Sequence, residues 1–184
     1  MNFVGIDYSM TSPGWTVING ERITSYFLTT KSKMLGEIKI SDSFSIVGIE
    51  YPDYKSDVER FNKLAKLTLS CMPLAAETKI AIEGYSFGST GARIFQIGEN
   101  GGVVKNLLWE NGYDVIAPAP TEIKKFASGK GNSRKDQMFD AFIKQTGFDE
   151  SYLRQTFNMQ GEIKSPLADI VDSYFLAMYV KSHS

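Results

Sequence analysis

Short runs of apolar and β-branched residues, bounded by polar and turn-forming ones, recur through the first 50 residues of the chain. These runs predict strands over 2–8, 14–20, 22–30 and 43–50. Asn19-Gly20 is a tight-turn signal between the second and third of these strands. Because short turns join antiparallel neighbours, we expect the first three strands to form an antiparallel meander. The pattern over 31–40 is ambiguous.

Beyond residue 50, segments with helical spacing alternate with short apolar runs. Apolar residues recur at this spacing between Val58 and Met72, which predicts a helix. Ser133 and Asp136 resemble a capping box, and Pro166 suits the first position of the last helix. Helices are predicted over 57–72, 93–111, 134–147 and from Ser165-Pro166 onward, and strands over 79–87 and 112–120. This order indicates one α/β (α+β mixed) domain over 1–184, with helices flanking a mixed sheet.

Composition narrows the chemistry. Hydrophobic residues make up 42% and charged residues 22% of the 184 residues, as in ordinary globular proteins. We expect a cytoplasmic protein, because no apolar run reaches the roughly 20 residues of a membrane span and no secretory signal is visible. Cys71 is the only cysteine and His183 the only histidine. These counts argue against a disulfide, a zinc cluster and histidine-based nucleophilic catalysis.

Four carboxylates stand in unusually apolar settings. Asp7 and Glu83 each close a short apolar strand, and Asp169 and Asp172 lie three residues apart in an apolar helix. Brought together, they would repel each other unless a cation neutralised them. Oxygen ligands suit Mg²⁺ or Mn²⁺, and two such ions can hydrolyse a phosphodiester without a histidine.

Each carboxylate also has a purely structural explanation. Asp7 could cap a turn, Glu83 could pair with a lysine, and Asp169 could favour the helix dipole from the first turns of its helix. A shared site accounts for all four at once, whereas the structural explanations are unrelated to one another.

Candidate nucleic-acid contacts lie in two further segments. The net charge is −1, yet Lys124, Lys125, Lys130, Arg134 and Lys135 form a basic block without an acidic residue. Such a block is either a solvated loop or a phosphate-contacting surface. Tyr85 and Phe87 follow Glu83 among glycines, and either they are core residues or one of them stacks on an unpaired base.

Four stretches together resemble the RuvC-like Holliday junction resolvases of the RNase H-like superfamily. They are "GIDYSMTSPGW", "AIEGYSF", "PTEIKKFASGKGNSRKDQM" and "ADIVDSYFLA", in the family's order. The resemblance implies an RNase H-like fold with catalytic metal ligands at Asp7, Glu83, Asp169 and Asp172. It places Lys124 and Lys135 near the scissile phosphate. It also implies two Mg²⁺ ions per active site, for which Mn²⁺ substitutes, and a homodimer that cleaves four-way DNA junctions.

The chain also departs from the family. Tyr8-Ser9 stands where the family has Pro-Gly, and the stretch around 41–57 is extra. These departures suggest a divergent, phage-encoded member. The alternatives are an RNase H or flap and branch endonuclease of the same fold, or a non-catalytic branched-DNA-binding protein. An ATP-binding sugar kinase or chaperone-type ATPase also begins with "GID", but the chain is short for one and lacks a second phosphate loop.

Overall fold

A seven-stranded mixed sheet forms the centre of the computed structural model, which describes residues 1–84 and 93–184. The strand order is β4-β5-β3-β2-β1-β6-β7. The strands are β1 (Asn2–Asp7), β2 (Gly14–Asn19), β3 (Arg22–Thr29), β4 (Gly36–Lys39), β5 (Phe44–Glu50), β6 (Thr78–Ile82) and β7 (Asp114–Ile116).

The strand pairing confirms the predicted meander. β1 and β3 both pair antiparallel with β2, and β6 then pairs parallel with β1 and with β7. The extra stretch around 41–57 contributes β5, which pairs parallel with β3 and antiparallel with β4. The ambiguous segment 31–40 forms a 3₁₀ turn, η1 (Ser32–Met34), and the whole of β4. The extra stretch therefore helps to widen the sheet at its β3 edge.

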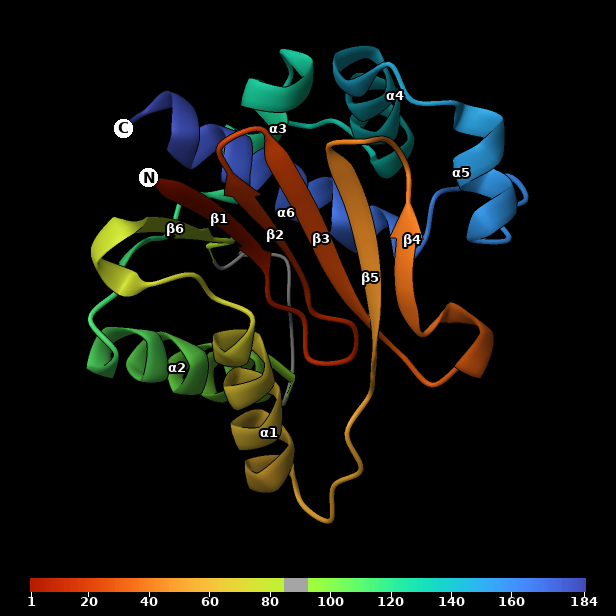
Figure 1. The fold of residues 1–184 in the computed structure, drawn as a ribbon. Coiled ribbons are helices and arrows are strands. Elements are labelled where there is room, and N and C mark those ends of the chain that lie inside the picture. Colours follow the sequence, from red (N-terminus) through yellow and green to blue (C-terminus); the bar gives the residue numbers. More distant parts are fainter. Residues whose placement is uncertain (85–92) are drawn as a thin grey trace.

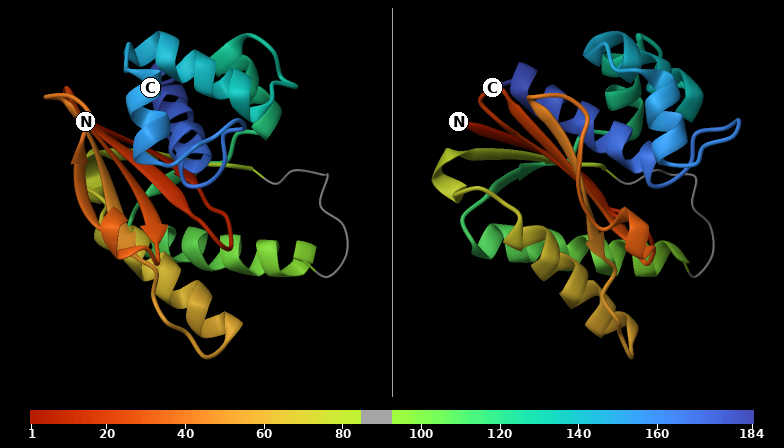
Figure 2. Two further views of the ribbon diagram at one scale, coloured as in Figure 1. Left: turned by 90° about the vertical axis from the view of Figure 1, so that its right-hand side faces the viewer. Right: turned by 45° about the vertical axis from the view of Figure 1, so that its right-hand side comes forward.

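Helices cover both faces of the sheet (Figures 1 and 2). One layer holds α1 and α2, and the opposite layer holds α3 to α6, with α6 lying directly on the strands. A second 3₁₀ turn, η2 (Ala75–Glu77), precedes β6. The helices are α1 (Asp57–Ser70), α2 (Arg93–Glu110), α3 (Pro120–Ser128), α4 (Lys135–Thr146), α5 (Glu150–Thr156) and α6 (Leu167–Ser182).

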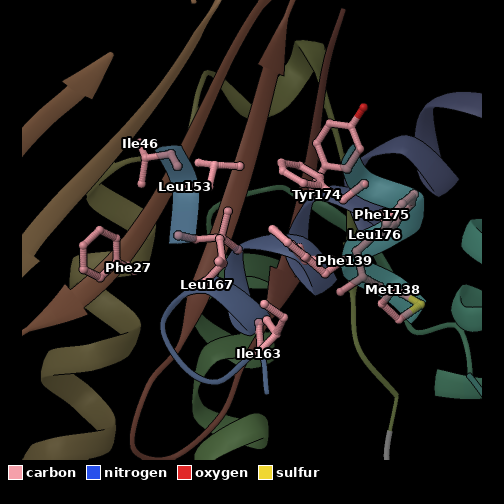
Figure 3. Packing of buried hydrophobic residues seen from close by; sticks show 14 of the residues in the cluster. Phe27, Ile46, Met138, Phe139, Leu153, Ile163, Leu167, Tyr174, Phe175 and Leu176 are labelled. Carbon is pink, nitrogen blue, oxygen red and sulfur yellow. The ribbon is translucent and has the colours of Figure 1, made fainter. Parts of the chain in front are cut away.

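Each layer has its own apolar core. Under α3 to α6, aromatic residues such as Phe27, Phe139 and Phe175 pack with no exposed surface (Figure 3). On the other side, Val4 and Ile6 of β1 pack with Leu64 of α1 and other residues of that layer. The sheet is therefore buried on both faces, which explains why β1 and β6 read as continuous apolar runs.

Several local predictions were wrong. Lys124 and Lys125 lie on α3, not in a loop, because Pro120 starts a helix whose first turn includes Glu122. The α4 cap is shifted by one residue, since Gln137 accepts from the Arg134 N–H at 3.0 Å while Asp136 accepts from the Ile163 N–H.

Two further boundaries and one core residue also differ from the prediction. Pro166 precedes the first residue of α6 and does not occupy the first helical position. The predicted strands at 79–87 and 112–120 are shorter, because β6 ends at Ile82 and β7 at Ile116. Val58 lies at the start of α1 with 77% of its surface exposed, so the apolar face of α1 begins at Phe61.

Candidate active site

Strand alternation turns Asp7 and Glu83 toward the α6 layer. Phe3 and Gly5 of β1 lie on that face, so Asp7, two positions on, shares it. Ala81 of β6 lies in the same core, so Glu83 continues on the same face beside Asp7. The Glu83 N–H donates to the Ile6 carbonyl at 2.9 Å, which continues the β1–β6 ladder to the site.

Direct packing of α6 on β1 brings the other two carboxylates to these strand ends. A Cβ atom at Gly5 would lie 2.1 Å from the Ser173 carbonyl oxygen and 2.2 Å from the Ala177 nitrogen, so only glycine permits this approach. Asp169 and Asp172 are therefore held close to the carboxyl ends of β1 and β6.

Asp169 is fixed by hydroxyl groups from two loops. Its Oδ2 accepts from the Ser12 hydroxyl at 2.7 Å, and its Oδ1 accepts from the Ser165 hydroxyl at 3.0 Å. Ser12 belongs to the loop between β1 and β2, where the Ser12 N–H donates to the Ser9 hydroxyl. At Gly14, a Cβ would come within 3.1 Å of the Asp169 Cβ. The loop after Asp7 therefore orients a carboxylate from the opposite part of the sequence.

The four carboxylates form one electrostatic cluster. Burial raises the pKa of Asp7 well above its usual value, and the charges of Glu83, Asp172 and Asp169 raise it further. The pKa of Asp172 rises to about 7, first through burial and then through the charges of Glu83 and Asp169. A cluster of this kind is strained when fully ionised and favours a bound cation.

Two lysines act electrostatically on the carboxylate cluster. Burial raises the pKa of Glu83, and the charges of Lys124 and Lys135 oppose that rise. Lys135 likewise lowers the pKa of Asp7 and of Asp169 against the dominant effect of burial. Lys124 is half-buried on α3, and Lys135 is exposed at the first position of α4. Both therefore face the carboxylate cluster.

The other basic residues of the block lie on the surface around these two. Lys125 is exposed on α3, Lys130 in the turn after it, and Arg134 at the residue before α4. The turn begins at Gly129, which has a φ of 80° and closes α3. Tyr85 and Phe87 lie outside the residues that the structure describes.

The donor chemistry of the cluster fits a hard divalent cation. All four side chains offer carboxylate oxygens, the ligands that Mg²⁺ and Mn²⁺ prefer. Over residues 1–84 and 93–184, no group of three acidic, histidine or cysteine side chains is placed to hold an ion as it stands.

The described part of the chain contains no helix with the length and apolarity of a membrane span. The sequence matches no protein-family model and no curated protein.

Solved structures give a clear likeness. Thermus thermophilus RuvC superposes with a TM-score of 0.61 and 18% identity, covering 100% of this chain and 97% of RuvC. The chain has the RuvC fold. The same bacterial RuvC in complex with Holliday junction substrate gives a TM-score of 0.60 at 17% identity, covering 100% of this chain and 96% of that one.

A more distant likeness spans most of the chain. The yeast mitochondrial Holliday junction resolvase Ydc2 matches with a TM-score of 0.54 and 13% identity, over 95% of this chain and 75% of Ydc2. These structural matches confirm the expected RNase H-like α/β fold. Within that RuvC fold, the sequence motifs did not predict the hydroxyl contacts of Ser12 and Ser165. Their signal was limited to small polar residues next to Pro13 and Pro166.

Proposed function

We propose that this chain is a metal-dependent endonuclease that cleaves branched DNA, with the four-way Holliday junction as its preferred substrate. The observation that carries the proposal is the convergence of Asp7, Glu83, Asp169 and Asp172 beside Lys124 and Lys135. The likeness to a RuvC whose structure includes Holliday junction substrate supports the choice of DNA substrate.

In this proposal Asp7, Glu83, Asp169 and Asp172 hold two Mg²⁺ ions, for which Mn²⁺ can substitute. Such ions, when bound, supply activation of a water and stabilisation of the leaving 3′ oxygen. Asp7 and Glu83 offer oxygens from two neighbouring strand ends, and Asp172 offers them from α6. Ser12 and Ser165 fix the direction of the Asp169 carboxylate.

The basic side chains then bind the DNA backbone. Lys135 is placed to offset the negative charge of the scissile phosphate, with Lys124 beside it. Lys125, Lys130 and Arg134 are exposed around them and position the flanking phosphates. Tyr85 or Phe87 would stack on an unpaired base at the junction centre.

We further propose that the enzyme acts as a homodimer, because symmetric cleavage of a junction requires two active sites. Exposed apolar side chains of α1 and α2 support this assembly. Val58 is 77% exposed and Val103 37%, and both line one groove between the two helices with Phe61 and Leu107. Phe95 is exposed on the same helix as Val103. Burying such a surface is typical of homodimer interfaces.

A cleavage assay with Mg²⁺ tests the proposal. The substrates are a four-way junction, a flap, a fork, a linear duplex and an RNA–DNA hybrid, each carrying one labelled strand. We expect paired nicks in the junction, none in the linear duplex, and no cleavage in EDTA. Preferred cleavage of the hybrid would instead identify an RNase H, and preferred cleavage of the flap or fork a branch endonuclease. Tight junction binding without cleavage of any substrate would identify a non-catalytic binding protein.

A further inference from the structure

A cavity of about 810 Å³ borders two of the four carboxylates, because Asp7 and Glu83 are among the residues that line it. Its remaining walls come from the loop after β1 and from α1 and α2, including Tyr8, Arg60 and Lys105. A volume of this size is typical of sites that hold a small organic ligand or a nucleotide. Any DNA strand whose phosphate reaches the carboxylates therefore passes next to this cavity.

Arg60 is an unusual residue to find in this wall. It is 91% buried, and its Nη2 pairs with the Asp57 carboxylate at 3.0 Å. The other Asp57 oxygen accepts from the Gln96 amide of α2 at 3.0 Å. The guanidinium also lies over the rings of Tyr54 and Phe61, at 5.2 and 5.3 Å from their centroids. Contacts from both helices and from the extra stretch thus fix the guanidinium plane.

Two buried polar atoms in the cavity walls remain unsatisfied. The Arg60 Nε–H and the Tyr8 hydroxyl have no hydrogen-bond partner in the described part of the chain. Arg154, on the opposite face of the molecule, is a structural arginine that serves as a comparison. It pairs with Glu150 at 2.7 Å, donates to the Gly161 carbonyl at 2.8 Å and lies over Phe139. Since buried polar groups are nearly always paired, the Arg60 wall has the character of a binding surface.

The extra stretch around 41–57 gives this wall its shape. The Tyr51 hydroxyl donates to the Met10 carbonyl at 3.3 Å, which ties the stretch to the loop after Asp7. Tyr54 covers one side of Arg60. Tyr8 itself stands where resolvases of the resembled family carry proline. Both departures from that family therefore contribute to the same cavity.

We propose that this cavity is a subsite for the cleaved DNA strand and that Arg60 donates to a phosphodiester oxygen next to the scissile phosphate. A fixed, planar guanidinium is well suited to a phosphate, and Lys105 adds a second cationic side chain to the cavity lining. The cavity volume accommodates the nucleotide that carries this phosphate. The proposal rests on the proposed nuclease function, because it assumes that DNA occupies the carboxylate cluster.

The test combines protein variants with modified substrates. Cleavage of a four-way junction in Mg²⁺ is measured for the wild type, Arg60→Gln, Arg60→Lys and the control Arg154→Gln. Each substrate carries one neutral methylphosphonate, moved along the cleaved strand on both sides of the cut but never at the scissile position. Circular dichroism and thermal unfolding check that each variant is folded.

We expect Arg60→Gln to lower kcat/KM about tenfold or more, as for loss of a hydrogen bond to a charged group, and Arg154→Gln to change it less than about twofold. At one position of the scan, the methylphosphonate should lower the kcat/KM of the wild type by a similar factor. At that position it should not lower the kcat/KM of Arg60→Gln any further. Arg60→Lys should retain part of the wild-type kcat/KM. It replaces Arg60→Gln in the methylphosphonate scan if Arg60→Gln does not fold.

If the losses from Arg60→Gln and from the methylphosphonate add at every position of the scan, the subsite proposal is overturned. Wild-type kinetics in Arg60→Gln would overturn it as well. Either result leaves the nuclease function intact. Absence of cleavage by the wild type on every substrate would overturn both proposals.

Discussion

Two buried polar clusters lie along α6, and they are built on opposite principles. Thr16, Ser25 and Ser173 form a neutral network with 2.8 Å contacts from Thr16 to both serines, and Ser173 donates to the Ile170 carbonyl at 3.0 Å. All three residues have no exposed surface. Next along the helix, Asp172 belongs to the four-carboxylate cluster, whose pKa values burial raises.

The two clusters differ in whether their buried polar groups have partners within the fold. In the neutral network each hydroxyl can donate once along a chain that ends on a carbonyl, so the buried groups are satisfied. The carboxylate cluster has two lysines for four acids, and none of the four forms an ion pair within the described part of the chain. The first cluster thus stabilises the packing of α6, whereas ionisation of the second costs stability, which is consistent with the cation binding proposed above.

The largest effect should come from Asp7→Asn, which removes a charge from the carboxylate cluster. We expect Mg²⁺-dependent cleavage to fall by more than about 100-fold, because the proposal makes Asp7 a metal ligand. Junction binding measured in Ca²⁺ and thermal unfolding should remain close to those of the wild type. Wild-type cleavage rates in this variant would remove Asp7 from the proposed site.

Asp172→Asn should stabilise the metal-free protein. The pKa of Asp172 is about 7 in the fold and 3.8 for the free side chain, so the folded state binds the proton more tightly. The cost of ionisation is therefore absent below about pH 4, grows between about pH 4 and 7, and levels off above 7. Urea unfolding in EDTA should show the variant more stable by roughly 1–3 kcal/mol at pH 8, with little difference near pH 4.

Magnesium provides the control for that measurement. Added Mg²⁺ should stabilise the wild type at pH 8 more than Asp172→Asn, because only the wild type keeps the full ligand set. A variant that is less stable than the wild type in EDTA at both pH values would show that Asp172 has a structural role.

Lys135→Ala tests whether the positive charge of Lys135, beside the carboxylate cluster, acts on the cleavage step. We expect the single-turnover cleavage rate to fall about tenfold while the dissociation constant of the junction changes less, because the proposal sets Lys135 against the scissile phosphate. Lys130→Ala is the matched control on the exposed turn, and it should affect binding more than the cleavage rate. If Lys135→Ala weakens junction binding without lowering the cleavage rate, Lys135 is a positioning residue.

The smallest effect should come from Thr16→Val in the neutral network. This change keeps the shape of the side chain and leaves Ser25 and Ser173 without their shared partner. The free energy of unfolding should fall by about 1–2 kcal/mol at every pH between 5 and 8, since no charge is involved. The rate of cleavage at saturating Mg²⁺ should be unchanged. A pH-dependent loss would contradict the separation of the two clusters.

Local patterns predicted the parts of this fold that depend on neighbours in sequence. The meander followed from the apolar and β-branched runs and from Asn19-Gly20, and the carboxylates stood out because Asp7 and Glu83 close apolar strands. The α3 helix was missed because Ala117-Pro118-Ala119-Pro120 reads as a proline-rich loop.

Long-range contacts account for most of the rest. The Ser12–Asp169 hydrogen bond joins residues 157 positions apart, and no local pattern marks it. Arg60 lies on α1 among polar residues, and its burial depends on Asp57, on Gln96 from α2 and on the Tyr54 ring. Side chains with partners set by tertiary packing carry little sequence signal of their own.

The close contact between Gly5 and α6 also determines when the carboxylate cluster is completed. During synthesis β1 leaves the ribosome well before the helix that packs on Gly5 and carries Asp169 and Asp172. Until that helix docks, Asp7 faces an incomplete site. An unfinished or truncated chain therefore holds only half of the carboxylates, and a proposed DNA-cutting activity is withheld until the fold is complete.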